Sequence, residues 1–518
     1  MLQVRVRVLF GAVVAVLLLL TAGASGALAA PAKIAWSKCF GGPFQCGTLQ
    51  VPLDYTQPSG TKISVAVIKL PATDPAHRLG SLVLNPGGPG GSGVDYVVDA
   101  GPILYTPEVR ARFDLVGFDP RGVARSTPLR CFGTINQAVS TFSPFAFPMT
   151  RDELSQLIAN DSRLVSACDR RGGRIVDHMA TADVARDMDS LRAALGDTQL
   201  TYAGISYGSY LGVTYANMFP DKVRAVVVDG VLDPIAWSTG RNGEATTLPF
   251  STREHSDAGT QATLNEFFRL CDAGGDRCAF SGGSAARYAA LAQQLLAHPI
   301  TITFPDGTSG TLGYADLIGF TLGAMFDSSV WPDFAAMLAD LEHQASAQQI
   351  GARAERFRGP SLYLPKRGFP HYFNFVENFA PIACADSNNP ASYEDWWNAG
   401  IAADAATGYF GRIWTWASGI CAAWDHTDAN RYMGPFDRRT SNPVLVVGNQ
   451  FDPATPYQGA VTVANLLRNS ALLTVHGWGH TSLFLSACAD QAISRYLVDL
   501  TTPNRGTVCE QDAVPFSP

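Results

Sequence analysis

The sequence predicts an α/β protein with a mostly parallel, doubly wound sheet and a large, mainly helical insertion before the last two strands. Short runs of Val, Leu and Ile end in turn residues, as buried parallel strands do. Segments with the helical period separate some of these runs, and strands that alternate with helices favour a parallel sheet covered on both faces. The strand rhythm stops between residues 234 and 441, which predicts the insertion.

Seven segments are predicted to be strands of the sheet. In chain order, the expected strands are Lys62–Leu70, Gly80–Gly88, Arg112–Gly122, Leu200–Ser206, Val223–Pro234, Asn442–Pro453 and Ala471–His480.

One helix between these strands has clear ends. In "TADVARDMDSLRAALG", Thr181 is the expected N-cap and Gly196 the expected stop. Val184, Met188 and Leu191 share one face, together with Leu195.

The interval from 235 to 440 is rich in aromatic residues and in Ala-rich helical patterns, such as Ala286–His298 and Asp333–Ala345. It is expected to form a lid on the sheet. The predicted organisation is a core in two parts, 30–234 and 441–518, with this lid between them.

The N-terminus has the pattern of a secretory signal peptide over residues 1–29. Arg5 and Arg7 precede an apolar run, and Ala27-Leu28-Ala29 fits the small-x-small cleavage rule. An uncleaved membrane anchor is the alternative, although the run is short for a span. The expected product is secreted or held at the cell envelope, with no stable membrane span after cleavage.

Composition excludes some partners. With 47% hydrophobic residues the chain can bury a large core, and its net charge of -7 gives no basic field for a phosphate backbone. Nucleic acid is therefore not expected as a partner.

The chain has 10 cysteines, and an even number in an exported protein indicates disulfides. None stands in a Cys-x-x-Cys pair with histidines at zinc spacing, so no metal site is expected. Sequence alone does not fix the pairing, but short closures are the simplest pattern. They are 39–46, 131–168, 271–278, 384–421 and 488–509.

Ser206 lies in the motif Gly-Ile-Ser-Tyr-Gly, directly after an expected strand. Glycines on either side permit a strained turn and close packing of the next helix, as in a nucleophile elbow. A serine hydroxyl is a weak nucleophile and needs a base. Gly-x-Ser-x-Gly alone also occurs by chance, so the motif needs partners.

Two partners follow the last two strands. Asp452 ends one strand and His480 ends the next, and the chain order Ser, Asp, His is that of the α/β-hydrolase triad. His480 is expected to take the Ser206 proton while Asp452 holds the imidazole. His476, in the same segment, is a competing base.

The loop "NPGGPGGSG" follows an early strand and offers glycine amides to a developing oxyanion. Together with the Tyr207 amide it would form an oxyanion hole, in which one donor is worth about 3–4 kcal/mol.

The chain resembles the exported tripeptidyl aminopeptidases, relatives of the proline iminopeptidases within the α/β-hydrolases. The resemblance runs from about Cys39 to the C-terminus. It is carried by "NPGGPGGSG", "GFDPRGVARSTP", "TADVARDMDSLRAALG", "YAGISYGSYLG", "VVDGVLDP", "FDPATP" and "GWGHTS", and less specifically by "ENFAPIACAD". It implies Gly88 and Tyr207 as oxyanion donors and Ser206, Asp452 and His480 as the triad. Pro86 stands where proline iminopeptidases usually have histidine, which argues against release of single prolines.

The expected function is that of a serine aminopeptidase that removes short peptides, in particular tripeptides, from free N-termini through an acyl-enzyme. No metal or organic cofactor is expected. An esterase or lipase on the same fold is the main alternative, because triad and oxyanion hole serve esters and amides alike. A non-catalytic exported binding protein is the more distant one.

Three further side chains are candidates for the site. Thr455, in "DPATP", either satisfies its own turn or holds Asp452 in register with His480. Glu377 and Asp386 are the candidate carboxylates for the α-amino group of the substrate, because apolar residues around them could desolvate an ion pair. Glu394 and Asp395 lie behind them in the chain.

Overall fold

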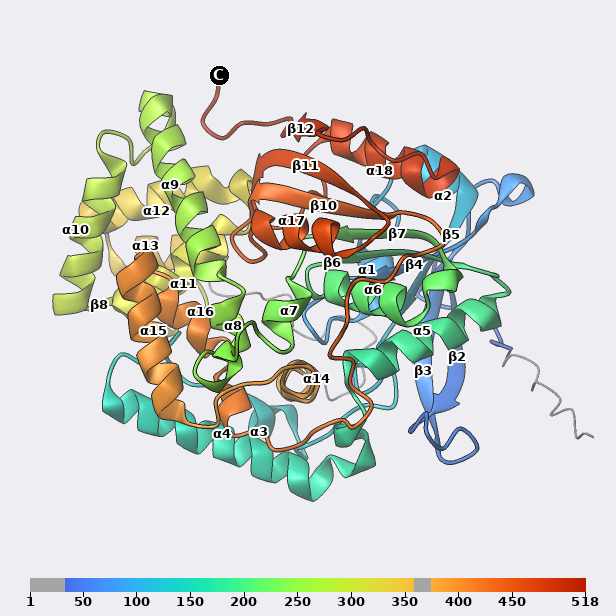
Figure 1. The fold of residues 1–518 in the computed structure, drawn as a ribbon. Helices are drawn as coiled ribbons and strands as arrows, with labels where there is room; N and C mark the ends of the chain where they lie inside the picture. The colour runs from blue at the N-terminus through green and yellow to red at the C-terminus, as the bar shows by residue number, and fades with distance from the viewer. Residues whose placement is uncertain (1–32, 358–373) are drawn as a thin grey trace, which may run out of the picture. The chain divides into compact units, whose positions relative to one another are not determined.

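A single large sheet runs through the protein, whose computed structural model describes residues 33–357 and 374–518 (Figure 1). The predicted signal peptide, residues 1–29, lies outside the described residues. The sheet has ten strands. Their spatial order is β1 (Ser37–Lys38), β2 (Gln45–Pro52), β3 (Lys62–Leu70), β5 (Phe113–Phe118), β4 (Gly80–Asn85), β6 (Leu200–Ile205), β7 (Val223–Asp229), β10 (Val444–Phe451), β11 (Ser470–Trp478) and β12 (Val508–Glu510).

Every expected strand is present, and the strands from β5 to β12 pair in parallel. The expectation of a parallel strand at Lys62–Leu70 is wrong, because β3 pairs antiparallel with both β2 and β5. Its burial alternates along the chain. That alternation is the pattern of an antiparallel strand with one covered face, whereas parallel strands are buried on both sides.

Helices cover both faces of the sheet. One face carries α1 (Gly93–Asp99), α2 (Pro107–Arg112) and α18 (Ala487–Asp499), and the other carries α5 (Thr181–Leu195), α6 (Tyr207–Met218) and α17 (Tyr457–Leu466). Neighbouring residues of β7 point to opposite sides, with Val226 and Val228 in one hydrophobic core and Ala225 and Val227 in the other. The doubly wound arrangement is therefore confirmed.

The N-terminal end of α5 differs from the expectation. Thr181 is not the N-cap: that position is Ala180, and no side chain caps the helix. The Thr181 hydroxyl contacts instead the Tyr207 hydroxyl and, at 2.5 Å, Asp386 Oδ2. Gly196 ends the helix with φ of 84°, as expected.

Between β7 and β10 the described residues form a series of helices and one hairpin, β8 (Ile300–Thr303) with β9 (Ser309–Leu312). The helices are α7 (Pro234–Trp237), α8 (Phe250–Arg253), α9 (Ser256–Gly274), α10 (Ser284–Ala297), α11 (Tyr314–Met325), α12 (Trp331–Glu342), α13 (Ala347–Ala354), α14 (Ala380–Asp386), α15 (Tyr393–Thr407) and α16 (Gly411–Trp416). All described residues belong to one compact unit, so the lid boundaries stay a prediction.

A second helical segment, between β5 and β6, was not expected. It contains α3 (Ile135–Val139) and the long helix α4 (Arg151–Arg171), which lies beside α15 (Figure 1). Arg151 pairs with Glu394 at 2.6 Å, and the Tyr393 hydroxyl donates to Asp161 at 2.9 Å. Helices from two segments of the chain, one between β5 and β6 and one between β7 and β10, therefore pack together.

All five expected disulfides are present, and no cysteine of the described chain is free. They join Cys39 to Cys46, Cys131 to Cys168, Cys271 to Cys278, Cys384 to Cys421 and Cys488 to Cys509. Within residues 33–357 and 374–518, none of the helices has the length and apolar character that a membrane span needs.

Candidate active site

Ser206 stands on a sharp turn between β6 and α6. Its φ is 56° and its ψ is −127°, a conformation that residues with a side chain rarely adopt. The Ser206 amide donates to the Asp229 carbonyl oxygen at 2.9 Å, which fixes the turn to the neighbouring strand. This is the geometry of a nucleophile elbow.

The flanking glycines are needed because the backbone packs closely here. A Cβ on Gly204 would lie 2.4 Å from the Gly208 carbonyl oxygen, and one on Gly208 would lie 2.9 Å from the Asn85 carbonyl oxygen. Any side chain at either position would push the helix away from the strand.

The predicted acid and base are in contact. His480 Nδ1 lies 2.9 Å from Asp452 Oδ1 and 3.0 Å from Oδ2. The competing base, His476, pairs with Glu510 at 2.6 Å instead. His480 is therefore the histidine that the structure joins to Asp452.

Asp452 is fully buried, and its carboxylate accepts hydrogen bonds from several donors. They are the amides of Ala454, Thr455 and Thr481, at 2.9, 2.8 and 2.9 Å, and the Thr455 hydroxyl at 2.9 Å. Burial opposes ionisation, but the His480 charge and these hydrogen bonds hold the pKa of Asp452 below its usual range.

The same pair makes His480 a stronger base. Burial alone would lower the pKa of the imidazole, but the charge and hydrogen bond of Asp452, with a further contribution from Asp229, raise it above its usual value. The protonated form of His480 is therefore stabilised, as the predicted role of a general base requires.

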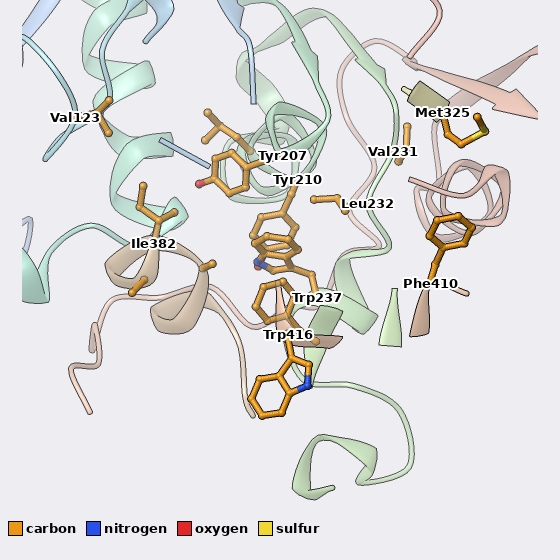
Figure 2. Packing of buried hydrophobic residues seen from close by; sticks show 14 of the residues in the cluster. Val123, Tyr207, Tyr210, Val231, Leu232, Trp237, Met325, Ile382, Phe410 and Trp416 are labelled. Carbon is orange, nitrogen blue, oxygen red and sulfur yellow. The ribbon is translucent and has the colours of Figure 1, made fainter. Parts of the chain in front are cut away.

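Ser206 and His480 line one cavity of about 250 Å³, together with Gly88, Thr455 and Glu254. The described atoms give no hydrogen bond between Ser206 and His480 in this conformation, and such bonds are often longer in unliganded enzymes. Aromatic rings pack behind the elbow: Trp237 lies 5.9 Å from Tyr207 and 5.6 Å from Tyr210, between ring centroids (Figure 2).

The loop after β4 passes directly over the elbow. A Cβ on Gly87 would lie 2.5 Å from the Ile205 carbonyl oxygen and 2.9 Å from Ser206 Cβ. The Gly88 and Tyr207 amides donate to no other group within the described residues. They are thus available to an oxyanion beside Ser206, and their role there stays a prediction.

Thr455 makes the contacts that a role in holding the acid requires. Its hydroxyl donates to Asp452 rather than to its own turn, and it lies 3.4 Å from His480 Nδ1.

The two candidate amine-binding carboxylates lie elsewhere. Asp386 is buried and accepts from the Thr181 amide and hydroxyl. Glu377 is also buried and accepts from the Cys131 amide at 3.4 Å. Neither lines the Ser206 cavity. Their assignment stays a prediction that this geometry does not support.

The sequence did not point to two other carboxylates near the predicted triad. Glu254 is 8% exposed and lines the cavity. Asp229, at the end of β7, accepts from the Ser482 amide and hydroxyl. Asp229 could have been found, since it ends a strand like the triad residues. Nothing in "TREHSD" signals Glu254.

Metal-ligating residue types gather at two places in the described chain, neither on the Ser206 cavity. They are Asp169 with Asp425 and His426, and His178 with Asp183 and Asp428. The prediction of a site without metal or cofactor stays a prediction.

Comparisons with known proteins agree with this geometry. Residues 80–265 match the family described as alpha/beta hydrolase fold, and residues 407–509 match the family described as TAP-like protein.

Three relatives cover most of the chain. Serine protease Hip1 of Mycobacterium tuberculosis is 32% identical over 90% of this chain and 87% of its own. Carboxylesterase B of the same species is 34% identical over 90% of this chain and 86% of its own. Tripeptidyl aminopeptidase of Streptomyces lividans is 29% identical over 95% of this chain and 90% of its own.

Proposed function

Because this chain belongs to the α/β-hydrolase family, with a TAP-like segment over residues 407–509, we propose that it is an exported serine aminopeptidase that releases tripeptides from free N-termini. The elbow at Ser206 and the Asp452–His480 pair supply the chemistry of a serine hydrolase. What distinguishes an aminopeptidase is a group that binds the substrate α-amine.

The aminopeptidase proposal rests mainly on the buried carboxylate of Glu254 in the Ser206 cavity. Its Oε2 accepts from the Asp233 amide at 3.1 Å, while its buried Oε1 has no hydrogen-bond partner among the described residues. A buried carboxylate oxygen without a donor is costly unless a ligand completes it. An ammonium group in the same cavity as Ser206 would do so.

The proton balance of such binding is favourable near neutral pH. Burial and the charge of Asp233 raise the pKa of Glu254 well above its usual range. An α-amine has a reference pKa near 7.7–8.0. A neutral amine that enters the cavity can take the Glu254 proton, which leaves a desolvated ion pair and no unpaired charge.

Catalysis then follows from the triad. Ser206 Oγ attacks the carbonyl carbon of the third residue while its proton passes to His480 Nε2, and the Gly88 and Tyr207 amides donate to the oxyanion. The C–N bond breaks, and His480 returns the proton to the departing amine. Water, deprotonated by His480, then hydrolyses the acyl-enzyme and frees the peptide.

Export is supported by the five disulfides, which form and persist in oxidising compartments. The signal-like pattern over residues 1–29 points the same way.

The test compares a free tripeptide anilide with its N-acetylated form. We expect Glu254→Gln to raise KM for the free substrate strongly and to reduce the preference for a free N-terminus, since the loss of one partner of a desolvated pair costs about 2–5 kcal/mol. Glu244→Gln, in the same segment but off the cavity, is the matched control. An unchanged preference in Glu254→Gln would refute the assignment, and the same assay on Glu377→Gln and Asp386→Asn tests the competing carboxylates.

Carboxylic ester hydrolysis is the second candidate, favoured by the similarity to Carboxylesterase B. A p-nitrophenyl ester tested beside the anilide separates the two activities. Ser206→Ala is expected to fold normally and to lose about 10⁴–10⁶-fold in kcat on either substrate. Failure of Ser206 to react with a fluorophosphonate would instead indicate a binding protein.

A further inference from the structure

A second, larger cavity adjoins the catalytic one. Its volume is about 660 Å³, and both cavities are lined by Gly88, Phe379 and Ala417. A substrate held at Ser206 therefore has room to extend past the oxyanion loop. The walls of this second cavity come from residues 88–90 and 141–142, from α4, from residues 375–379 and from residues 416–420.

Aromatic rings form much of its surface. Phe142 and Phe375 lie 5.8 Å apart between ring centroids. Trp416, also on the wall, stacks on Tyr393 at 6.4 Å with an interplanar angle of 15°. Such faces pack well against the methylene groups of a long side chain and attract a cation.

One ionisable side chain, Asp161 of α4, lies on this wall among the described residues. It accepts one hydrogen bond, from the Tyr393 hydroxyl to Oδ2 at 2.9 Å, and no described lysine, arginine or histidine pairs with it. Burial raises the pKa of Asp161 to about 7. The carboxyl is thus a partly desolvated acid without a counter-ion at the wall of an apolar cavity.

We propose that the second cavity binds a lysine or arginine side chain of the substrate and that Asp161 is the residue that selects it. This inference deepens the proposed function and rests on it. The ammonium or guanidinium group pairs with Asp161 Oδ1, and the stem of the side chain packs on the aromatic wall. Asn160 and Asn378 supply further polar groups without adding charge.

A disulfide fixes each of two walls of the second cavity. Cys131–Cys168 ties α4 to the loop after β5, and Cys384–Cys421 ties α14 to the segment that carries the opposite wall. A selective site requires this rigidity, since a charge that can move to solvent discriminates poorly.

The test uses pairs of substrates that differ in charge but hardly in shape. Lysine and norleucine are placed in turn at each of the three positions before the scissile bond, in free tripeptide anilides. We expect kcat/KM to favour lysine at one position by about tenfold or more, and this ratio to fall to near one in Asp161→Asn while the norleucine substrate is unaffected. Glu394→Gln removes an exposed carboxylate next to Tyr393 and should leave the ratio unchanged.

A pH series gives a readout that a structural defect would not produce. Asp161 must be ionised to bind the cation, so the lysine-to-norleucine ratio should rise with pH through neutrality, while His480 titrates equally for both substrates and cancels. Tyr393 is the one titratable group in hydrogen-bonding contact with Asp161 in the described chain. A ratio independent of pH, or one unchanged in Asp161→Asn, would overturn the proposal.

Two further experiments distinguish binding of a substrate side chain from binding of the α-amine, and this proposal from the proposed peptidase function. If Asp161→Asn abolishes the preference for a free over an acetylated N-terminus and leaves the lysine ratio intact, the bound cation is the α-amine and the side-chain assignment is wrong. N-acetylated tripeptide p-nitrophenyl esters, with lysine or norleucine in turn at each of the same three positions, test Asp161 even if no peptide is cleaved. If the esters show a lysine preference that depends on Asp161 but no free tripeptide anilide is cleaved, the proposed aminopeptidase function fails and the role of Asp161 in selection stands. If peptides are cleaved without any lysine preference, the role of Asp161 fails and the proposed function stands.

Discussion

Asp229 is a second buried carboxylate that acts on His480, the proposed catalytic base. It accepts two hydrogen bonds from Ser482, and burial raises its pKa to about 6. Above that pH its charge adds to that of Asp452 and raises the pKa of His480. Because His480 must be neutral to accept a proton, the acidic limb of the rate profile reports this pKa.

Asp229→Asn is therefore expected to move the acidic limb of kcat/KM to lower pH. Asn keeps acceptors for Ser482 but removes the charge that favours the imidazolium. The shift should be less than about one pH unit, since Asp452 has the larger effect on His480. A pH–rate profile with a small ester measures it, and a shift to higher pH would contradict the role.

Thr455→Val tests whether a hydroxyl holds the acid in register. The substitution removes the donor to Asp452 Oδ2 and leaves the two amide donors to Oδ1 in place. We expect kcat to fall by about tenfold, the equivalent of roughly 1.5 kcal/mol, with KM and the melting temperature nearly unchanged. A lower melting temperature with normal kcat would show that the hydroxyl only stabilises the turn.

At this scale the sequence is informative where chemistry sits at the end of a strand. Ser206, Asp452 and His480 each follow a strand, so their order and position predict the contact between acid and base. Glu254 and Asp161 come from helical segments with no such signal. Neither carboxyl group forms an ion pair within the described chain, and this depends on segments far apart in the sequence.

Among the elements, the loop after β4 is closely constrained by its neighbours. Gly87 has a φ of 85°, and its backbone lies so close to the elbow that an added Cβ would overlap the Ile205 carbonyl oxygen. The sequence predicts a glycine-rich loop here, but it does not predict which glycine meets the nucleophile.

Gly87→Ala is expected to lower kcat/KM by about 100-fold or more, because the added Cβ displaces either the elbow or the oxyanion loop by more than a rate-determining contact tolerates. Gly282→Ala is the control, since its φ of 91° imposes similar backbone strain but open space surrounds it. Circular dichroism and kinetics on both variants separate the two effects. Equal losses in the two variants would mean that strain alone is responsible.

The strand β3 shows why residue composition does not predict whether a strand pairs parallel or antiparallel. Apolar residues mark Lys62–Leu70 as a strand, but whether its neighbours run the same way depends on how the chain returns. Here β2 precedes it as a hairpin partner, and β2 itself was not predicted. Its polar residues, such as Gln45 and Gln50, conceal it in the sequence.

Over the whole molecule, local sequence patterns predict the sheet and the helices that cover it. They do not predict how the helices inserted between strands pack against one another. The sequence predicts one helical insertion, after β7. The structure adds α4, from between β5 and β6, through Arg151–Glu394 and Asp161–Tyr393. These contacts join residues more than two hundred positions apart, and no periodicity within either segment reveals them.

The helices outside the core come from two segments of the chain, one between β5 and β6 and one between β7 and β10, and this has an evolutionary consequence. In the proposed mechanism, bond breaking depends on loops at the ends of β4, β6, β10 and β11. Apart from residues 88–90 of the loop after β4, the walls of the second cavity belong to other segments, namely residues 141–142, α4, residues 375–379 and residues 416–420. Mutations in those walls can change which side chains are accepted without moving a triad atom. Substrate specificity and catalytic rate can thus evolve separately. A homologue can acquire a new specificity through single mutations, each of which leaves an active enzyme.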